Sequence, residues 1–258
     1  PRQNVETGFW LESDRMLSLD FSERSLEVQR GVVMEEFKQR CLNQPYGDVG
    51  HLLRPLAYQT HPYQWPTIGK ELSHIANATL EEVKAFFFRF YAPNNAILAV
   101  TGNISFEEAV ELTEKWFGSV PRREVPVRNL PQEPEQTEER RLTVERNVPL
   151  DSLFMAYHMC DHRHPDYYVF DILSDVLSNG RSSRLNQHLV QEKQLFSSID
   201  AYISGSVDAG LFHIAGKPSA GVSLELAEAA VRDELDRLQQ ELVDGQELEK
   251  VKNKFEST

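Results

Sequence analysis

The chain has few cysteines, no long apolar run and no excess of basic residues. Only Cys41 and Cys160 are cysteine, and they do not form the Cys-x-x-Cys spacing of zinc or redox sites. No apolar run approaches the length that crosses a bilayer. The 40 acidic residues outnumber the 27 basic ones, and a net charge of -13 repels phosphates. Neither nucleic acid nor a membrane is therefore an expected partner.

Metal and phosphate motifs are also missing. None of the eight histidines forms His-x-x-Glu-His or His-Glu-x-x-His, in which zinc peptidases place two histidine ligands. GRSSRL, residues 180–185, lacks the Gly-Lys-Ser/Thr ending of a phosphate-binding loop. HMCDHRH, residues 158–164, contains five donor-type side chains, but an extended segment points neighbouring side chains to opposite sides. A native metal site is therefore not expected there. The five donor-type residues of this segment are His158, Cys160, Asp161, His162 and His164.

Helix signals dominate the first half of the chain. Two helices are predicted over residues 9–44, the second with Ser22 as N-cap, and a short one over Val49 to Ala57. Thr79 with Glu82 forms a capping box, and Ser105 caps a helix that runs to about Phe117. The apolar run NAILAVTGN, residues 95–103, predicts a buried strand.

The composition changes after Val120. Four prolines and many glutamates before Arg140 predict a linker between two packed parts. The second part alternates strand and helix patterns, so the fold class is predicted as α+β. Strands are expected near residues 142–144, 152–158, 198–204 and 210–215, and helices over 167–177, 184–193, 222–242 and from 246 onward.

One carboxylate interrupts the helix VQRGVVMEEFK, residues 28–38. Glu36 lies two turns after Gln29, with Val32 and Val33 beside it, so it is expected to point partly inward. One interpretation is a boundary carboxylate paired with a Lys or Arg. The other is a metal ligand, although a catalytic zinc needs three protein donors and Glu36 supplies at most one.

The order of several motifs resembles the insulysin/pitrilysin family of zinc peptidases, which includes the mitochondrial processing peptidases. The motifs are FWLESDRM, RGVVMEEFKQR, NQPYG, HPYQWPTIG and FFFRFYAPNNAILAVTGNIS, followed by HPDYYVFDILSDVLSNGRSSRLNQHLVQEKQLFSSIDA. Together they cover nearly the whole chain.

This resemblance implies two homologous α+β half-domains with mixed or antiparallel sheets covered by helices. Residues 1–120 would be the C-terminal part of the first, catalytic domain, residues 121–137 a linker, and residues 138–258 the N-terminal part of the second domain. The resemblance also implies that Glu36 is a zinc ligand, with Glu35 as the register alternative. It further implies that HMCDHRH is a simple loop leading into HPDYY. Gln29 takes the place of a glutamate that is frequent in the family.

The family's His-x-x-Glu-His motif would lie before the first residue, and both ends of the chain resemble cuts in a longer protein. The parent is therefore expected to be a zinc metallopeptidase that encloses peptide substrates with a second homologous half or subunit. The present chain, with no catalytic residue and without zinc, is expected to be inactive alone. The compartment stays open.

Two alternatives follow from the same residues. The chain could belong to a non-catalytic relative that serves as scaffold or partner half, which the substitution at Gln29 favours, or to an unrelated α+β binding module. The predicted strand over residues 95–102 would lack upstream neighbours. The chain is thus expected either to build a composite sheet from both parts or to pair with a second copy as a homodimer.

Overall fold

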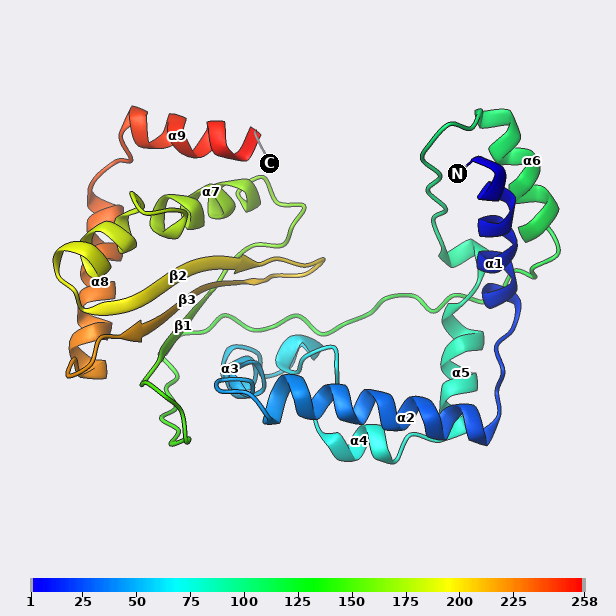
Figure 1. Cartoon of the computed structure of the whole chain (residues 1–258), viewed down its shortest axis with the longest axis horizontal. Helices are drawn as coiled ribbons and strands as arrows, with labels where there is room; N and C mark the ends of the chain where they lie inside the picture. Colours follow the sequence, from blue (N-terminus) through cyan, green and yellow to red (C-terminus); the bar gives the residue numbers. More distant parts are fainter. Residues whose placement is uncertain (1, 257–258) are drawn as a thin grey trace. The chain divides into compact units, whose positions relative to one another are not determined.

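The computed structural model describes residues 2–256, which form two compact units (Figure 1). Unit 1 comprises Pro1–Gln44 and Trp65–Gln132, and unit 2 comprises Pro45–Gln64 and Glu133–Thr258. Residues 45–64 therefore group with the second part of the chain, although the sequence placed them within residues 1–120. They do so because helix α3 (Val49–Ala57) packs against strand β1 (Leu153–His158). The division into two homologous domains stays a prediction.

Unit 1 consists of helices joined by loops. Its α-helices are α1 (Val5–Leu17), α2 (Glu23–Phe37), α4 (Leu72–Ala76), α5 (Leu80–Phe90) and α6 (Phe106–Phe117), with short turns at Arg2–Asn4, Lys38–Leu42 and Pro93–Asn95. The predicted caps are confirmed. The hydroxyls of Ser22 and Ser105 accept backbone N–H groups of their own first turns, and Thr79 forms the full capping box with Glu82.

The predicted strand in unit 1 is wrong. Residues 96–101 belong to no strand, and Ile97 is 97% exposed. All three strands of the described chain lie in unit 2, so no composite sheet forms from the two parts. A short apolar run becomes a strand only when another strand supplies hydrogen-bonding partners, and unit 1 provides none within residues 2–256.

Unit 2 is a three-stranded antiparallel sheet covered by helices, which confirms the α+β class. The strand order is β1, β3 (Leu211–Pro218), β2 (Phe196–Ser204). The helical elements are α3, a turn at Pro62–Gln64, α7 (Tyr167–Ser178), a π-helix at Asn186–Glu192, α8 (Leu224–Gln240) and α9 (Gly245–Glu256). The strand expected near residues 142–144 is wrong: Leu142 is half exposed, and no strand pairs with this segment.

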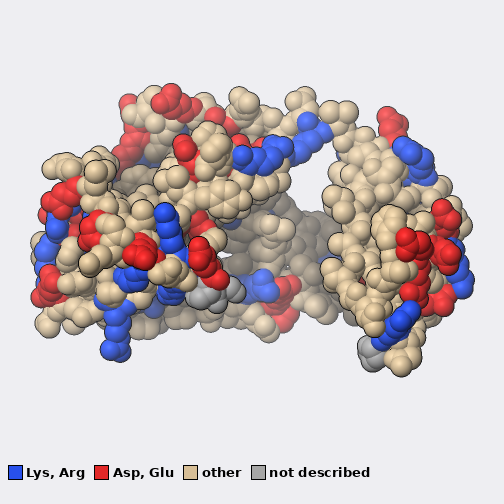
Figure 2. Space-filling model, turned by 90° about the horizontal axis from the view of Figure 1, so that it is seen from above, with Lys and Arg blue, Asp and Glu red and all other residues tan. Residues whose placement is uncertain are grey.

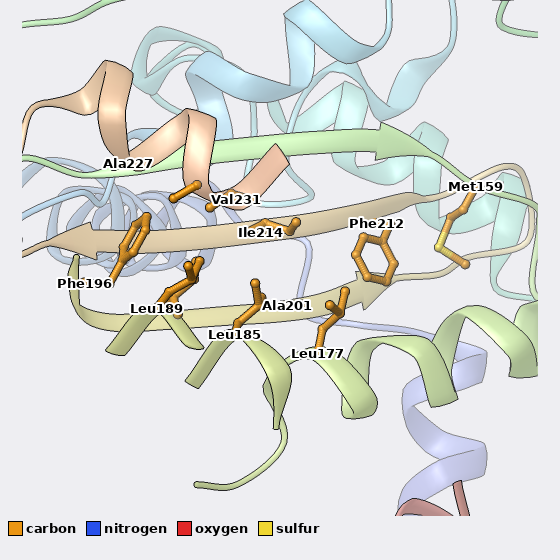
Figure 3. Close-up of a cluster of buried hydrophobic side chains, with 12 residues drawn as sticks. Met159, Leu177, Leu185, Leu189, Phe196, Ala201, Phe212, Ile214, Ala227 and Val231 are labelled. Carbon is orange, nitrogen blue, oxygen red and sulfur yellow. The ribbon is translucent and has the colours of Figure 1, made fainter. Parts of the chain in front are cut away.

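The main core lies between one face of this sheet and the helices. Phe212 and Ile214 of β3 alternate with His213, in keeping with the two-residue period of a strand. Leu177 of α7 and Leu189 of the π-helix point toward the strands (Figure 3). The opposite face carries a smaller cluster of Ala57, Tyr58 and Leu211. None of the helices described between residues 2 and 256 is long and apolar enough to cross a membrane.

His213 sits on that opposite face of the central strand. Its Nε2 atom is 2.7 Å from the Ser204 hydroxyl, and its ring stacks on Tyr202, its cross-strand neighbour. Burial lowers the pKa of His213 to about 4, and the positive charge of Arg54 adds to the effect. The folded unit therefore holds this imidazole neutral.

The free energy of unfolding should fall as the pH falls from about 6.5 to about 4, because the unfolded chain takes up a proton that folded His213 refuses. His213→Gln should flatten this part of the pH dependence, as measured by urea unfolding at several pH values. His74→Gln, at an exposed position in α4, is the control and should behave as wild type. Identical pH dependence in wild type and His213→Gln would contradict the assignment.

Candidate functional site

Glu36 lies in the last turn of α2, beside a buried anchor. The helix begins at Ser22, whose hydroxyl accepts the Ser25 N–H at 3.2 Å. The helix ends at Phe37, which is 4% exposed, and the chain continues into the π-helix Lys38–Leu42. The carboxylate is thus carried by a regular helix whose end is fixed by core packing.

Arg30 holds the middle of the same helix. Its Nη2 atom donates to the carbonyl oxygen of Ala78 at 2.6 Å, next to the N-cap Thr79 of α5. It also forms an ion pair with Glu27 one turn earlier. The Arg30 Nε atom is buried and has no hydrogen-bond partner in the described chain. The guanidinium therefore ties α2 to the start of α5 through its terminal nitrogens.

The Glu36 carboxylate is half exposed and paired. Its Oε1 atom lies 2.8 Å from the Nη2 atom of Arg40, one turn later, and 43% of the side chain is exposed. Glu35 is more exposed, at 54%, and lies 3.6 Å from the Lys38 ammonium. Gln29 lies on the exposed surface of α2. The ion pair of the simpler interpretation is present, and the role of Glu36 as metal ligand stays a prediction.

The other candidate metal donors do not come together. No group of three or more His, Cys, Asp or Glu side chains in residues 2–256 could hold a metal ion. In HMCDHRH the expected loop is confirmed: His162 Nδ1 lies 2.7 Å from the carbonyl oxygen of Ser206, and His164 Nδ1 accepts the Asp166 N–H. Burial raises the pKa of the Cys160 thiol. Because a catalytic zinc needs three protein donors, the described residues alone do not fit one.

GRSSRL serves as a structural turn. The Arg184 guanidinium pairs with Glu247 of α9 at 2.8 Å, and both side chains are largely buried. The Lys250 ammonium donates to the Ser182 hydroxyl at 2.9 Å. Both contacts bind this turn to α9.

A partly buried polar cluster in unit 2 was not predicted. It consists of His61, Tyr63, Ser206 and Asp208. His61 is 4% exposed, and its Nδ1 accepts the Tyr63 N–H, so Nε2 carries the proton and donates to Asp208 at 3.1 Å. The Tyr63 hydroxyl lies 2.7 Å from the Ser206 hydroxyl. These contacts join the loop after α3 to the β2–β3 hairpin and leave His61 closed to solvent.

Glu133 holds the same loop from the linker side. Its carboxylate accepts the backbone N–H groups of Gln59, Thr60 and His61 and the Thr60 hydroxyl, at 2.7–3.0 Å. Burial acts to raise the pKa of Glu133, but these donors outweigh it and lower the pKa to about 2. In the sequence, Glu133 is one of many glutamates in the linker, so only the folded loop distinguishes it.

The side drawn in Figure 2 shows no large cluster of basic side chains. On the side drawn in Figure 2, acidic and basic side chains form small mixed groups. This distribution agrees with the acidic balance of the sequence, since nucleic-acid binding needs clustered Lys and Arg.

Comparison with known proteins decides the family. Residues 77–255 match the sequence profile described as "Peptidase M16 inactive domain". The chain belongs to the peptidase M16 family. The resemblance to the insulysin and pitrilysin peptidases is thereby confirmed.

Named relatives are zinc proteases. The chain is 30% identical over 252 residues to the zinc protease PqqE of Helicobacter pylori, covering 96% of this chain and 56% of PqqE. It is 26% identical to the uncharacterized zinc protease YmxG of Bacillus subtilis, covering 95% of this chain and 58% of that protein. The crystal structure of a protease from Helicobacter pylori is 29% identical with a TM-score of 0.89, covering 99% of this chain and 62% of that one. The chain thus spans about three-fifths of the length of these relatives.

Glu133→Gln should lower the free energy of unfolding of unit 2 by about 1–3 kcal/mol at neutral pH, because it removes a charge that accepts several N–H groups. Since the pKa is lowered in the fold, the stabilisation is complete above about pH 4.5 and is lost as the pH falls toward 2. The measurement is chemical unfolding followed by circular dichroism.

Glu135→Gln is the matched control, two residues away and exposed. It should leave the stability unchanged. Equal stabilities of Glu133→Gln and wild type at neutral pH would contradict the role given to the Glu133 carboxylate.

Proposed function

We propose that this chain is part of a zinc-dependent endopeptidase and that Glu36 supplies one of its zinc ligands. The observation that carries the proposal is the position of RGVVMEEF. In a chain whose relatives are named zinc proteases, this motif places a half-exposed carboxylate in the last turn of a firmly held helix. Glu36 is preferred over Glu35 because it is the less exposed of the two and adjoins buried Phe37.

The same proposal makes the chain inactive when isolated. Bound zinc supplies a Lewis acid that activates water, and three protein donors normally hold the ion. Within residues 2–256 Glu36 belongs to no group of three or more His, Cys, Asp or Glu side chains that could hold a metal ion. Two further ligands and the general base would therefore come from residues outside this chain. The Arg40 guanidinium, 2.8 Å from Glu36, would meanwhile orient the free carboxylate.

A second homologous half or subunit is part of this proposal. The chain spans only 56–62% of relatives that align over nearly all of it. The sequence SLEVQRGVV of α2 has a counterpart in ELEKVKNKF of α9, which supports a duplicated domain plan. We propose that two such halves enclose the peptide substrate.

A non-catalytic role is the second candidate. Gln29 replaces a frequent family glutamate and is exposed on α2, and the matched family profile is described as inactive. A scaffold or partner half would need no zinc. The two candidates differ in the residues that precede this segment in the parent protein, where a peptidase requires His-x-x-Glu-His.

In the full-length protein, Glu36→Gln should abolish peptide cleavage and lower zinc retention at least about tenfold, because an amide is a much poorer zinc ligand than a carboxylate. Zinc content after dialysis and hydrolysis of a quenched fluorescent peptide measure both effects. Glu35→Gln is the control and should retain zinc and activity.

If Glu35→Gln lost zinc and peptide cleavage while Glu36→Gln kept full activity, the zinc ligand would be Glu35 and not Glu36. A full-length protein that binds no zinc and cleaves no peptide in its wild-type form would favour the non-catalytic role.

A further inference from the structure

Residues 45–64 of unit 2 form a lid over the sheet face that lies opposite the main core. Its helix α3 packs against β1, and Ala57 and Tyr58 form a small apolar cluster with Leu211 of β3. The Tyr58 hydroxyl also donates to the carbonyl oxygen of Ala209 at 3.0 Å. Among the described residues, the main core contains none from the lid. The lid can therefore open locally while that core stays packed.

A strap of irregular chain, residues 133–150, fastens the lid. Neither helix nor strand is formed anywhere in residues 121–150. The contacts between strap and lid are hydrogen bonds and ion pairs that are spaced along the whole lid. They are Glu133 to the N–H groups of residues 59–61, Arg140 to the Leu56 carbonyl oxygen (2.6 Å), Arg146 to Asp48 (2.9 Å) and the Leu150 carbonyl oxygen to the Tyr46 hydroxyl (2.7 Å).

Tyr46 begins the lid in a strained backbone conformation. Its φ of 63° lies in the left-handed region, which a bulky residue rarely adopts. Two contacts hold it there: the hydroxyl donates to Leu150, and the Lys217 ammonium lies 5.1 Å from the centroid of the ring. The closed lid therefore keeps a conformation that costs free energy, and opening releases it.

His213 lies on the sheet face that the lid covers. Burial and the positive charge of Arg54 in α3 lower the pKa of His213 from 6.5 to about 4. With the lid open, the imidazole meets water and its pKa returns to the ordinary value. A proton therefore binds the open form more strongly than the closed form.

Arg54 is the charge that acts on His213. The surrounding elements carry further titratable or charged groups. They are His51 of α3, Tyr58, His61 and Tyr63 of the lid, His158 of β1, Asp200 and Tyr202 of β2, Asp208 of the β2–β3 turn and Lys217 of β3.

We propose that the lid is a pH-sensitive switch, which the strap holds closed at neutral pH and which protonation of His213 opens while the main core stays folded. Opening uncovers Leu211 and moves Arg54 away from the new positive charge. Since the pKa of His213 is about 4 with the lid closed and 6.5 with it open, the opening equilibrium rises about 30-fold between pH 8 and pH 5. The switch does not depend on the zinc role of Glu36.

Amide hydrogen exchange of the full-length protein measures the opening. Protection factors, which exclude the intrinsic pH dependence of exchange, should be at least about tenfold lower for α3 than for Ile214 of β3 at pH 8. They should fall about 30-fold further in α3 by pH 5. His213→Gln should remove most of this fall, whereas His74→Gln, at an exposed position in α4, should retain it. Equal protection of α3 and Ile214, or an unchanged fall in His213→Gln, would overturn the switch.

Glu133→Gln tests the strap. It should lower the protection of the α3 amides at least about fivefold at pH 8, because the charge that accepts the N–H groups of residues 59–61 is lost. The dependence on pH should remain, since His213 is still present. Glu135→Gln is the exposed control and should exchange as wild type. Faster exchange confined to residues 59–61 would show that Glu133 holds only its own loop, and would overturn the role of the strap.

Discussion

Main-chain hydrogen bonding along β3 is the interaction on which unit 2 depends. β3 pairs with β1 on one side and with β2 on the other, so the polar backbone is satisfied while Phe212 and Ile214 enter the core. Unit 1 contains no paired strands within residues 2–256. Residues 96–101 of unit 1 form no strand and leave the side chains of Ile97 and Leu98 exposed.

The candidate metal ligand lies in the unit that lacks a sheet. Glu36 is held by the Ser22 cap, by Arg30 and by Phe37. No group of three or more His, Cys, Asp or Glu side chains in residues 2–256 could hold a metal ion. Membership of the peptidase M16 family accounts for the motif, and the three-fifths span of the relatives accounts for the need for donors from elsewhere. Zinc binding and substrate enclosure would therefore both require more polypeptide than these residues.

Local signals in the sequence were sufficient for the helices. Ser22, Thr79 and Ser105 cap the helices as predicted, and α3 spans Val49–Ala57 as expected, because caps and apolar periodicity act within a few residues. Strands depend on partners that are distant in the chain. The runs at residues 95–102 and 142–144 have strand-like composition, but no neighbouring strand is present, so both predictions were wrong.

The candidate site shows the same limit of local reasoning. One interpretation of the helical period was a boundary carboxylate paired with a Lys or Arg, and Arg40 is such a partner. The prediction that Glu36 binds zinc came from the order of motifs along the chain. The cluster of His61, Tyr63, Ser206 and Asp208 joins residues more than 140 positions apart, so no local pattern indicated it.

A zinc-bound structure of the full-length protein tests the central claim most directly. A Glu36 carboxylate oxygen should lie about 2.0–2.2 Å from the ion, with two imidazole nitrogens from the preceding part of the protein completing the protein ligands. A zinc ion held entirely by other residues, with Glu36 still paired to Arg40, would contradict the account.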